Sequence, residues 1–358
     1  MKFLDLFAGI GGFRMGLESL GHECVGFCEI DKFARKSYKA IHNTEGEIEL
    51  HDITEVSNEE WRNFRGTVDI ICGGFPCQAF SIAGKRKGFL DETRGTLFFE
   101  IARAVKEIQP PLLFLENVKG LLSHDQGRTF RTILSTLDEL GYDAEWQVLN
   151  SKDFGVPQNR ERVFIIGHLR GTGGRPVFPI FGKNGTINQA NIKQIGNINN
   201  SASFGCNPQT GRVYDIEGIS PTLNTMHGVA VAGDMALGAM QGGEGQTKIR
   251  VREATKQGFA EASVGDSVNL AHPNSKTRRG RVGKQIANTL LTGESQGVVE
   301  PDLRIRKLTP RECWRLQGFP DWAFDKAQEV NSNSQLYKQA GNSVTVNVIK
   351  TIAERLGQ

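Results

Sequence analysis

The first 170 residues alternate between short apolar runs and segments with helical periodicity, and this alternation limits the fold more than any other feature. Short runs rich in β-branched residues are typical of buried strands, and apolar residues that recur every three or four positions are typical of amphipathic helices. The pattern predicts strands at 2–7, 23–29, 68–73, 112–117, 144–149 and 162–168. It predicts helices at 13–20, 32–41, 96–108 and 127–140. Repeated strand and helix units of this kind predict a doubly wound α/β domain with a mostly parallel sheet.

The composition of the chain changes after Arg170, where Gly, Asn, Ser and Thr become frequent and long apolar runs disappear. This composition predicts a smaller, irregular, mainly β domain of short strands and loops. Helical patterning returns from Ile305 and ends in a segment, 344–356, whose apolar residues fall on one face. We therefore predict a first domain at 1–170, a second at 171–303 and a C-terminal segment, 304–358, that returns to the first domain.

Length, hydropathy and cysteine content exclude several classes of protein. The longest strongly apolar runs, 111–118 and 163–169, are too short to cross a bilayer, and no charged-then-apolar leader follows Met1. We therefore expect a soluble, cytoplasmic protein that does not bind membranes. Six cysteines are too few for a disulfide scaffold in 358 residues. Cys24 and Cys28 lack a second pair of ligands nearby, so we expect no zinc or other metal.

The distribution of charge permits a nucleic-acid partner without requiring one. The formal net charge is only +3, but from residue 170 to 300 Lys and Arg outnumber Asp and Glu by 14 to 9. A dense basic cluster lies at 276–281 and includes Arg278 and Arg279. Such a cluster is typical of a nucleic-acid contact, and it is equally typical of a solvated loop.

A glycine-rich turn follows the first predicted strand. Ala8-Gly-Ile-Gly-Gly12 precedes a helix, so its amides face the carboxyl end of the sheet, where open α/β folds bind ligands. Glu29 ends the second predicted strand, and an acidic residue there suits the hydroxyl groups of a ribose. The two features together favour an adenosine derivative as ligand.

After the strand at 68–73, Cys77 lies in a predicted turn that contains Gly and Pro, at the same edge of the sheet. A thiol in that position can act as a nucleophile, whereas Cys72 is predicted inside the strand. Glu116 ends the next strand, so a carboxyl group reaches the same edge. Neither motif contains histidine, which argues against a protease-type pair. A thiol beside an acid fits attack on an electron-poor ring that needs protonation.

Six segments closely resemble, in order, the motifs of the DNA cytosine-5 methyltransferases of bacterial or phage type. They are 5–13 (DLFAGIGGF), 73–81 (GGFPCQAFS), 116–118 (ENV), 158–162 (QNRER), 311–319 (RECWRLQGF) and 341–344 (GNSV). The resemblance implies a Rossmann-like methyltransferase fold with a seven-stranded sheet. It covers nearly everything except 171–300, the region that this family varies to recognise its target.

The resemblance also implies the roles of individual residues. Cys77 would attack C6 of a cytosine flipped out of double-stranded DNA, while Glu116 holds N3 and the exocyclic amine. Arg162 would meet the cytosine O2, with Arg160 nearby and Gln158 as support. C5 would take a methyl group from S-adenosylmethionine, and the base that removes the C5 proton stays open, with water as one candidate. The residues implied to hold S-adenosylmethionine are Phe7, Gly9, Gly11, Glu29, Asp52, Ile53 and Asn342.

Candidate DNA contacts come from two regions. A basic loop at 81–95, with Ser81, Lys85 and Arg86, can close over DNA or be an ordinary exposed turn. Thr289 with Leu290 resembles the Thr-Leu pair usual in the recognition region of this family, and Thr222 with Leu223 is the competing match.

Two other functions stay open: a catalytically silent DNA-binding module, and an RNA cytosine methyltransferase of the animal type that shares these motifs. Complete motifs argue against the first, and the long variable segment favours DNA over RNA. We expect a monomer. A restriction endonuclease acting on the same site, without a stable complex, is one expected partner, and a phage or solitary enzyme is the alternative. The target sequence cannot be read from the chain.

Overall fold

The structure is a computed structural model that describes residues 1–76, 97–182, 194–197, 212–214, 248–271, 275, 277–293 and 295–356. The chain forms two compact units. Unit 1 comprises Met1–Leu149, Glu161–Ile219 and Val346–Gln358, and unit 2 comprises Asn150–Arg160 and Ser220–Thr345.

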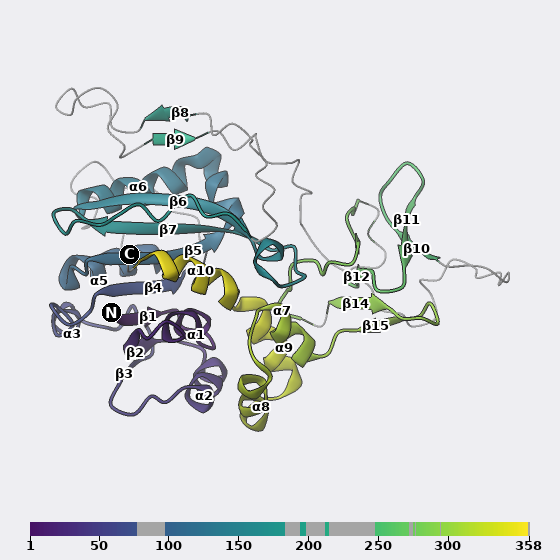
Figure 1. The fold of residues 1–358 in the computed structure, drawn as a ribbon, viewed down its shortest axis with the longest axis horizontal. Helices are drawn as coiled ribbons and strands as arrows, with labels where there is room; N and C mark the ends of the chain where they lie inside the picture. The colour runs from purple at the N-terminus through teal and green to yellow at the C-terminus, as the bar shows by residue number, and fades with distance from the viewer. Residues whose placement is uncertain are drawn as a thin grey trace. The chain divides into compact units, whose positions relative to one another are not determined.

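A seven-stranded sheet forms the centre of unit 1 (Figure 1). Its strands are β1 (Lys2–Leu6), β2 (Glu23–Cys28), β3 (Ile48–Leu50), β4 (Ile70–Gly74), β5 (Leu112–Val118), β6 (Tyr142–Asn150) and β7 (Glu161–Leu169). They lie in the order β3-β2-β1-β4-β5-β7-β6. Pairing is parallel from β3 through β5, whereas β7 runs antiparallel to β5. The prediction of a doubly wound, mostly parallel sheet is confirmed.

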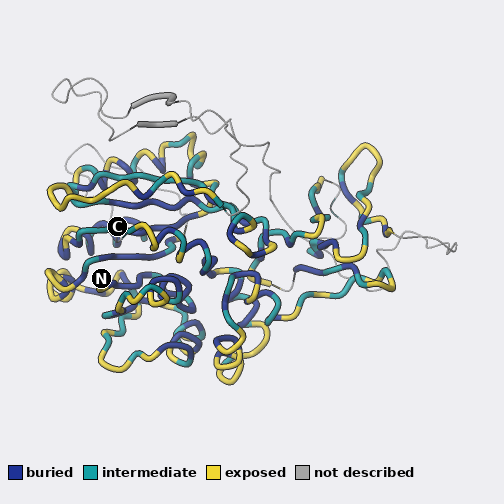
Figure 2. The backbone as a smooth tube through the Cα atoms, in the orientation of Figure 1, coloured by how far each residue is buried: buried dark blue, intermediate teal, exposed yellow. Residues whose placement is uncertain are grey.

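Alternate residues of one strand point to opposite faces of the sheet. Both faces of this sheet are covered, so that residues on either side are buried. Leu113 and Leu115 join a core cluster with α3 (Asn58–Arg62), α5 (Leu97–Ile108) and α6 (Arg128–Glu139). Phe114, between them, meets Phe13 of α1 (Gly12–Glu18) edge to face at 5.0 Å. The buried strands and the exposed outer surfaces are visible in Figure 2.

Helix α10 (Val346–Leu356) packs against α1 in unit 1. A Cβ on Gly16 of α1 would lie 2.7 Å from Cγ2 of Ile349, so glycine allows the two helices to approach closely. Helix α2 (Lys32–Ile41) follows β2 and begins at Asp31, whose carboxylate accepts the backbone N–H groups of Phe33 and Ala34. Of the predicted C-terminal segment, 304–358, the residues up to Thr345 belong to unit 2 and those from Val346 onward belong to unit 1.

The described residues of unit 2 form a small antiparallel β region and three α-helices. The strands are β10 (Lys248–Arg252), β11 (Phe259–Ser263), β12 (Ser267–Asn269), β13 (Val282–Gly283), β14 (Gln296–Val299) and β15 (Ile305–Lys307). The helices are α7 (Pro310–Leu316), α8 (Asp321–Val330) and α9 (Asn333–Asn342). β10 pairs with β11, and the other four form a sheet in the order β13-β12-β14-β15. The predicted smaller, mainly β region is therefore present.

Short elements complete the described chain. Three 3-10 helices are η1 (Lys119–Leu122), η2 (His124–Gly127) and η3 (Ser151–Phe154), and β8 (Gln194–Asn197) pairs antiparallel with β9 (Arg212–Tyr214). Among the helices of the described ranges, none has the length and apolar character needed to cross a membrane.

Candidate active site

The glycine-rich turn joins β1 to α1 in unit 1. Phe7, Gly9 and Gly11 have φ angles of 54°, 57° and 83°, so the backbone repeatedly enters the left-handed region. Glycine tolerates that region at little cost, whereas other residues are strained there. At Gly11 space is also missing, because a Cβ would lie 2.1 Å from Nε2 of His42. The turn therefore requires glycine at this position for two separate reasons.

Glu29, directly after β2, is fixed against this turn. Its Oε2 accepts the backbone N–H of Gly9 at 2.8 Å, and its Oε1 accepts that of Asp31 at 2.7 Å. Burial raises the pKa of Glu29, and the two backbone hydrogen bonds act in the opposite direction. The carboxylate thus lies beside the turn in a fixed orientation.

These residues fit an adenosine-type cofactor. Each oxygen of Glu29 accepts one backbone N–H and retains a further lone pair, which suits the two hydroxyl groups of a ribose. Ile30, next in the chain, is 68% exposed and offers apolar surface to a base. Asp52 accepts both the N–H and the hydroxyl of Thr54 on Oδ1, at 2.9 and 2.7 Å. Ile53 is buried in the core of unit 1.

A buried ion pair joins Glu116 of β5 to Arg162 of β7. Nε of Arg162 lies 2.9 Å from Oε1 of Glu116, and the side chains are only 16% and 9% exposed, respectively. The antiparallel register places Arg162 opposite Val118, two residues from Glu116 on the same face. Burial lowers the pKa of Arg162, and the carboxylate of Glu116 counteracts that effect. The structure therefore brings together an acid and a cation that are 46 positions apart in sequence.

Cys77 lies outside the described residues, as do Ser81, Lys85 and Arg86. The chain is described as far as Pro76, just beyond β4. Nδ2 of buried Asn117 donates to the backbone carbonyl of Phe75 at 2.7 Å, which links the end of β5 to the segment that leads to Cys77. Asn117 belongs to the motif at 116–118, which predicts no separate role for it. Cys72 is fully buried in β4, as predicted, and burial raises the pKa of its thiol well above the ordinary value.

The segments that carry Gln158 and Thr289 are hydrogen-bonded to each other in unit 2. Gln158 is fully buried; its Nε2 donates to the carbonyl of Leu316 at 2.8 Å, and its Oε1 accepts the N–H of Leu290 at 3.2 Å. The hydroxyl of Thr289 donates to the carbonyl of Asn159 at 2.7 Å. The competing pair at Thr222 lies outside the described residues. Gln158 thus connects three segments of unit 2 that are distant in sequence.

Arg160 also belongs to unit 2. It is buried, and its Nη2 donates to the carbonyls of Gly341 and Ser343 at 3.1 and 2.6 Å. Asn342, the last residue of α9, is exposed between these two carbonyls. Arg160 therefore holds the backbone that carries Asn342, a contact that the sequence pattern did not indicate.

The basic turn at 277–282 is organised by Glu253. The carboxylate of this buried residue accepts the backbone N–H groups of Gly280, Arg281 and Val282 at 3.1, 2.6 and 3.3 Å. Arg279 is exposed, and its Nε donates to the carbonyl of Ala254 at 2.8 Å. Arg278 is half-buried. The backbone of this turn is thus held by hydrogen bonds to Glu253.

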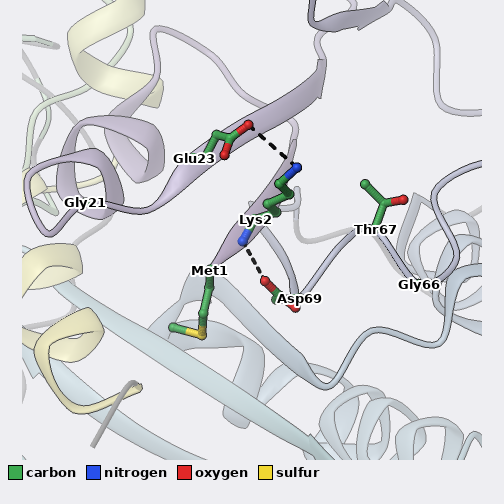
Figure 3. A pocket seen from close by; sticks show the side chains of 7 residues that line it. All are labelled: Met1, Lys2, Gly21, Glu23, Gly66, Thr67 and Asp69. Atoms are coloured by element: carbon green, nitrogen blue, oxygen red, sulfur yellow. Dashed lines mark hydrogen bonds and ion pairs between the residues drawn. The ribbon is translucent and has the colours of Figure 1, made fainter.

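A pocket lies at the edge of the sheet opposite the glycine-rich turn, and polar and charged residues predominate in its lining (Figure 3). It is lined by Met1, Lys2, Gly21, Glu23, Gly66, Thr67 and Asp69. The N–H of Lys2 donates to Asp69 at 2.7 Å, and its Nζ lies 3.8 Å from Glu23. This pocket lies at the amino ends of β1, β2 and β4 and contains none of the predicted site residues.

The fold and the glycine turn define a doubly wound α/β protein with a ligand-binding type of turn after its first strand. The crystal structure of the S. pombe Dnmt2 methyltransferase matches with a TM-score of 0.58 at 17% identity, over 99% of this chain and 98% of that chain. In sequence, the family described as C-5 cytosine-specific DNA methylase matches residues 1–358. The chain belongs to this family.

Named relatives are similar over nearly their whole length. The type II methyltransferase M.HpaII of Haemophilus parainfluenzae is 37% identical, over 99% of this chain and 90% of its own length. The type II methyltransferase M.HhaI of Haemophilus parahaemolyticus is 36% identical, over 100% and 94%. Membership of the family implies S-adenosylmethionine-dependent methylation of DNA. In the part of the chain that the structure describes, His, Cys, Asp and Glu side chains form no group of three that could hold a metal ion.

Proposed function

We propose that this enzyme transfers a methyl group to C5 of a cytosine flipped out of a specific short duplex sequence, through a covalent bond between Cys77 and C6. The observation that carries the proposal is the Glu116–Arg162 pair at 2.9 Å. It places an acid and a hydrogen-bond donor at the end of β5, beside the strand that leads to Cys77. Their roles toward the base follow from the family resemblance.

In the proposed reaction the thiolate of Cys77 attacks C6, forming an S–C bond while Glu116 holds N3 and the exocyclic amine. Protonation at N3 directs the electron pair of the ring toward C5. Arg162 donates to O2 and fixes the orientation of the ring. Bound S-adenosylmethionine supplies an electrophilic methyl group for C5. Loss of the C5 proton, to water or another base, then expels the thiolate of Cys77, and return of the N3 proton to Glu116 restores the ring.

Seven residues are proposed to hold the cofactor, and their roles follow from the family resemblance. The fixed carboxylate of Glu29 suits the ribose, and Gly9 and Gly11 suit the methionine portion. Phe7, Asp52 and Ile53 are proposed for the adenine, and Asn342 is the seventh residue. The hydrogen bonds of Arg160 to the carbonyls on either side of Asn342 support a defined position for that residue.

DNA binding is proposed to use cations in two regions. Arg278 and Arg279 on the Glu253-supported turn, with Thr289, belong to the proposed target-recognition domain at 171–303. Ser81, Lys85 and Arg86 would contact phosphates from the loop after Cys77. A base inside a duplex cannot present C6 to a thiol, so flipping is required and costs roughly a few kcal/mol. A monomer suffices, with a cognate restriction endonuclease as a separate enzyme that acts on the same site.

Transfer of tritiated methyl from S-adenosylmethionine to duplex DNA, compared with transfer RNA, tests the proposed substrate. We expect label in DNA, at positions that bisulfite sequencing identifies. Label confined to transfer RNA would favour the RNA enzyme, and no label in either would favour a silent DNA-binding module. DNA containing 5-fluorocytosine should trap the enzyme covalently at Cys77, because the C5 fluorine cannot leave as a proton does. Absence of this adduct in an active preparation would exclude the covalent route.

A further inference from the structure

The cofactor turn has a second support on the side of helix α2. His42 follows the end of α2 and is only 7% exposed. Its Nε2 lies 3.3 Å from the carbonyl oxygen of Ile10, and Nδ1 lies 3.7 Å from Oε2 of Glu18. The ring also fills the space beside Gly11, where a Cβ would lie 2.1 Å from Nε2. One imidazole therefore contacts two consecutive residues of the turn.

The ring of His42 is itself held in place. Its backbone N–H donates to the carbonyl of Tyr38 at 2.9 Å, and the two rings lie 4.8 Å apart. Tyr38 stacks on Phe27 of β2 at 4.3 Å. Glu18, which faces Nδ1, accepts Nε of Arg14 at 2.8 Å. The groups around His42 leave it little freedom to move away from the turn.

Burial at this position favours a neutral imidazole. Burial lowers the pKa of His42 below its ordinary value, with Arg14 acting in the same direction and Glu18 in the opposite one. Arg14 is in turn paired with Glu47 at 2.7 Å. A neutral ring carries one N–H, and the carbonyl of Ile10 can only accept. Because that carbonyl can only accept, Nε2 of His42 is the donor in the contact of 3.3 Å with Ile10.

We propose that His42 is a positioning residue for the cofactor-binding turn, acting through Ile10 and Gly11. The proposal rests on the proposed role of that turn in binding S-adenosylmethionine. Glu29 fixes the N–H of Gly9 from one side, and His42 fixes the carbonyl of Ile10 from the other. Without the second contact the turn can adopt other backbone angles, so affinity for the cofactor falls while DNA binding is retained.

Calorimetric titration of the full chain with S-adenosylhomocysteine tests this role with three variants. His42→Phe keeps the ring volume but removes the donor, and we expect its Kd to rise about fivefold to tenfold, as for loss of one buried hydrogen bond. His42→Gln retains a donor at the position of Nε2 and should restore most of the affinity. His22→Phe, at the amino end of β2, is the matched control and should bind as wild type does. In methyl transfer, His42→Phe should raise KM for S-adenosylmethionine and leave KM for DNA unchanged.

Two results would overturn the proposal. The first is a folded His42→Phe variant with wild-type affinity and only a lower Tm, which makes the residue purely structural. The second is equal weakening in His42→Phe and His42→Gln, which removes the hydrogen bond as the cause. Wild-type protein that binds no S-adenosylhomocysteine would instead refute the proposed cofactor pocket itself, and His42 with it.

Discussion

Asn117 donates a hydrogen bond from Nδ2 to the carbonyl of Phe75 at 2.7 Å, and so connects the end of β5 to the chain two residues before Cys77. Without that donor the buried carbonyl of Phe75 would lose its hydrogen bond, which lowers the free energy of unfolding by about 1–3 kcal/mol. For Asn117→Ala we expect kcat to fall roughly tenfold to a hundredfold, because Cys77 loses its support. Affinity for S-adenosylhomocysteine should stay at the wild-type value. Weakened cofactor binding with normal kcat would contradict this role.

Cys72 and Cys77 form an internal comparison of two thiols. Cys77→Ala should abolish methyl transfer and leave DNA binding largely intact, since binding depends on phosphate contacts and the proposed recognition domain. Cys72→Ala should lower the free energy of unfolding by ~1–2 kcal/mol, because its side chain is fully buried in β4, while kcat per folded molecule is retained. Methyl-transfer rates and urea denaturation measure the two effects. Activity in Cys77→Ala would exclude covalent catalysis by that residue.

The Glu116–Arg162 pair predicts coupled effects on stability and catalysis. Glu116→Gln keeps an acceptor for Arg162, so the fold should persist while transfer drops by about a hundredfold or more through loss of the acid. Arg162→Leu leaves a buried carboxylate without its counter-charge and should destabilise the protein by roughly 3–5 kcal/mol. In the double variant that combines Glu116→Gln with Arg162→Leu, the loss of stability should differ from the sum of the losses in the two single variants. Simple additivity in urea denaturation would show that the side chains do not interact.

Asp5 predicts a dependence of stability on pH. It is fully buried, it accepts hydrogen bonds from Tyr38 and Cys72, and burial raises its pKa to about 8. The unfolded chain loses this proton near its ordinary pKa of 3.8, whereas the folded chain keeps it to about 8. The contribution of Asp5 to stability therefore declines as pH rises through that interval. Asp5→Asn should raise Tm most at pH 8 and progressively less toward pH 5, and a pH-independent difference would contradict this assignment.

Glu253 offers a test of the basic turn in unit 2. Glu253→Ala removes the acceptor of three backbone N–H groups, so the turn carrying Arg278 and Arg279 should lose its conformation. We expect weaker DNA binding with a shallower dependence on salt, because phosphate contacts release counterions. Glu253→Gln, which retains one acceptor oxygen, should have an intermediate effect. Affinity for S-adenosylhomocysteine should not change, and a parallel loss of both affinities would indicate general unfolding of the variant.

Much of the sheet could be predicted from sequence because its buried strands are continuous apolar runs. Strand β3 (Ile48–Leu50) was missed, since three half-exposed or exposed residues at an edge carry no periodicity. Helix α3 (Asn58–Arg62) is also too short for a helical pattern, although its capping box, Ser57 with Glu60, was a readable signal. The domain boundaries proposed from composition stay predictions.

For the candidate site, motifs identified the residues but not their partners. The meeting of Glu116 and Arg162 depends on the antiparallel register of β5 and β7, which no local pattern encodes. His42 and Asn117 were not recognised because each bonds to a backbone carbonyl. Every residue has such a carbonyl, so no sequence pattern indicates which one is bound. The roles of the site residues, Cys77 above all, remain predictions that the variants above can test.

The packing of α10 against α1 has a consequence for synthesis of the protein. Ile349 fills the surface left open by Gly16, yet more than 300 residues separate the two in the chain. During translation α1 leaves the ribosome before α10, and its apolar partner emerges only after the residues between them have been made. The nascent chain must therefore keep that surface exposed during this interval, when aggregation competes with folding.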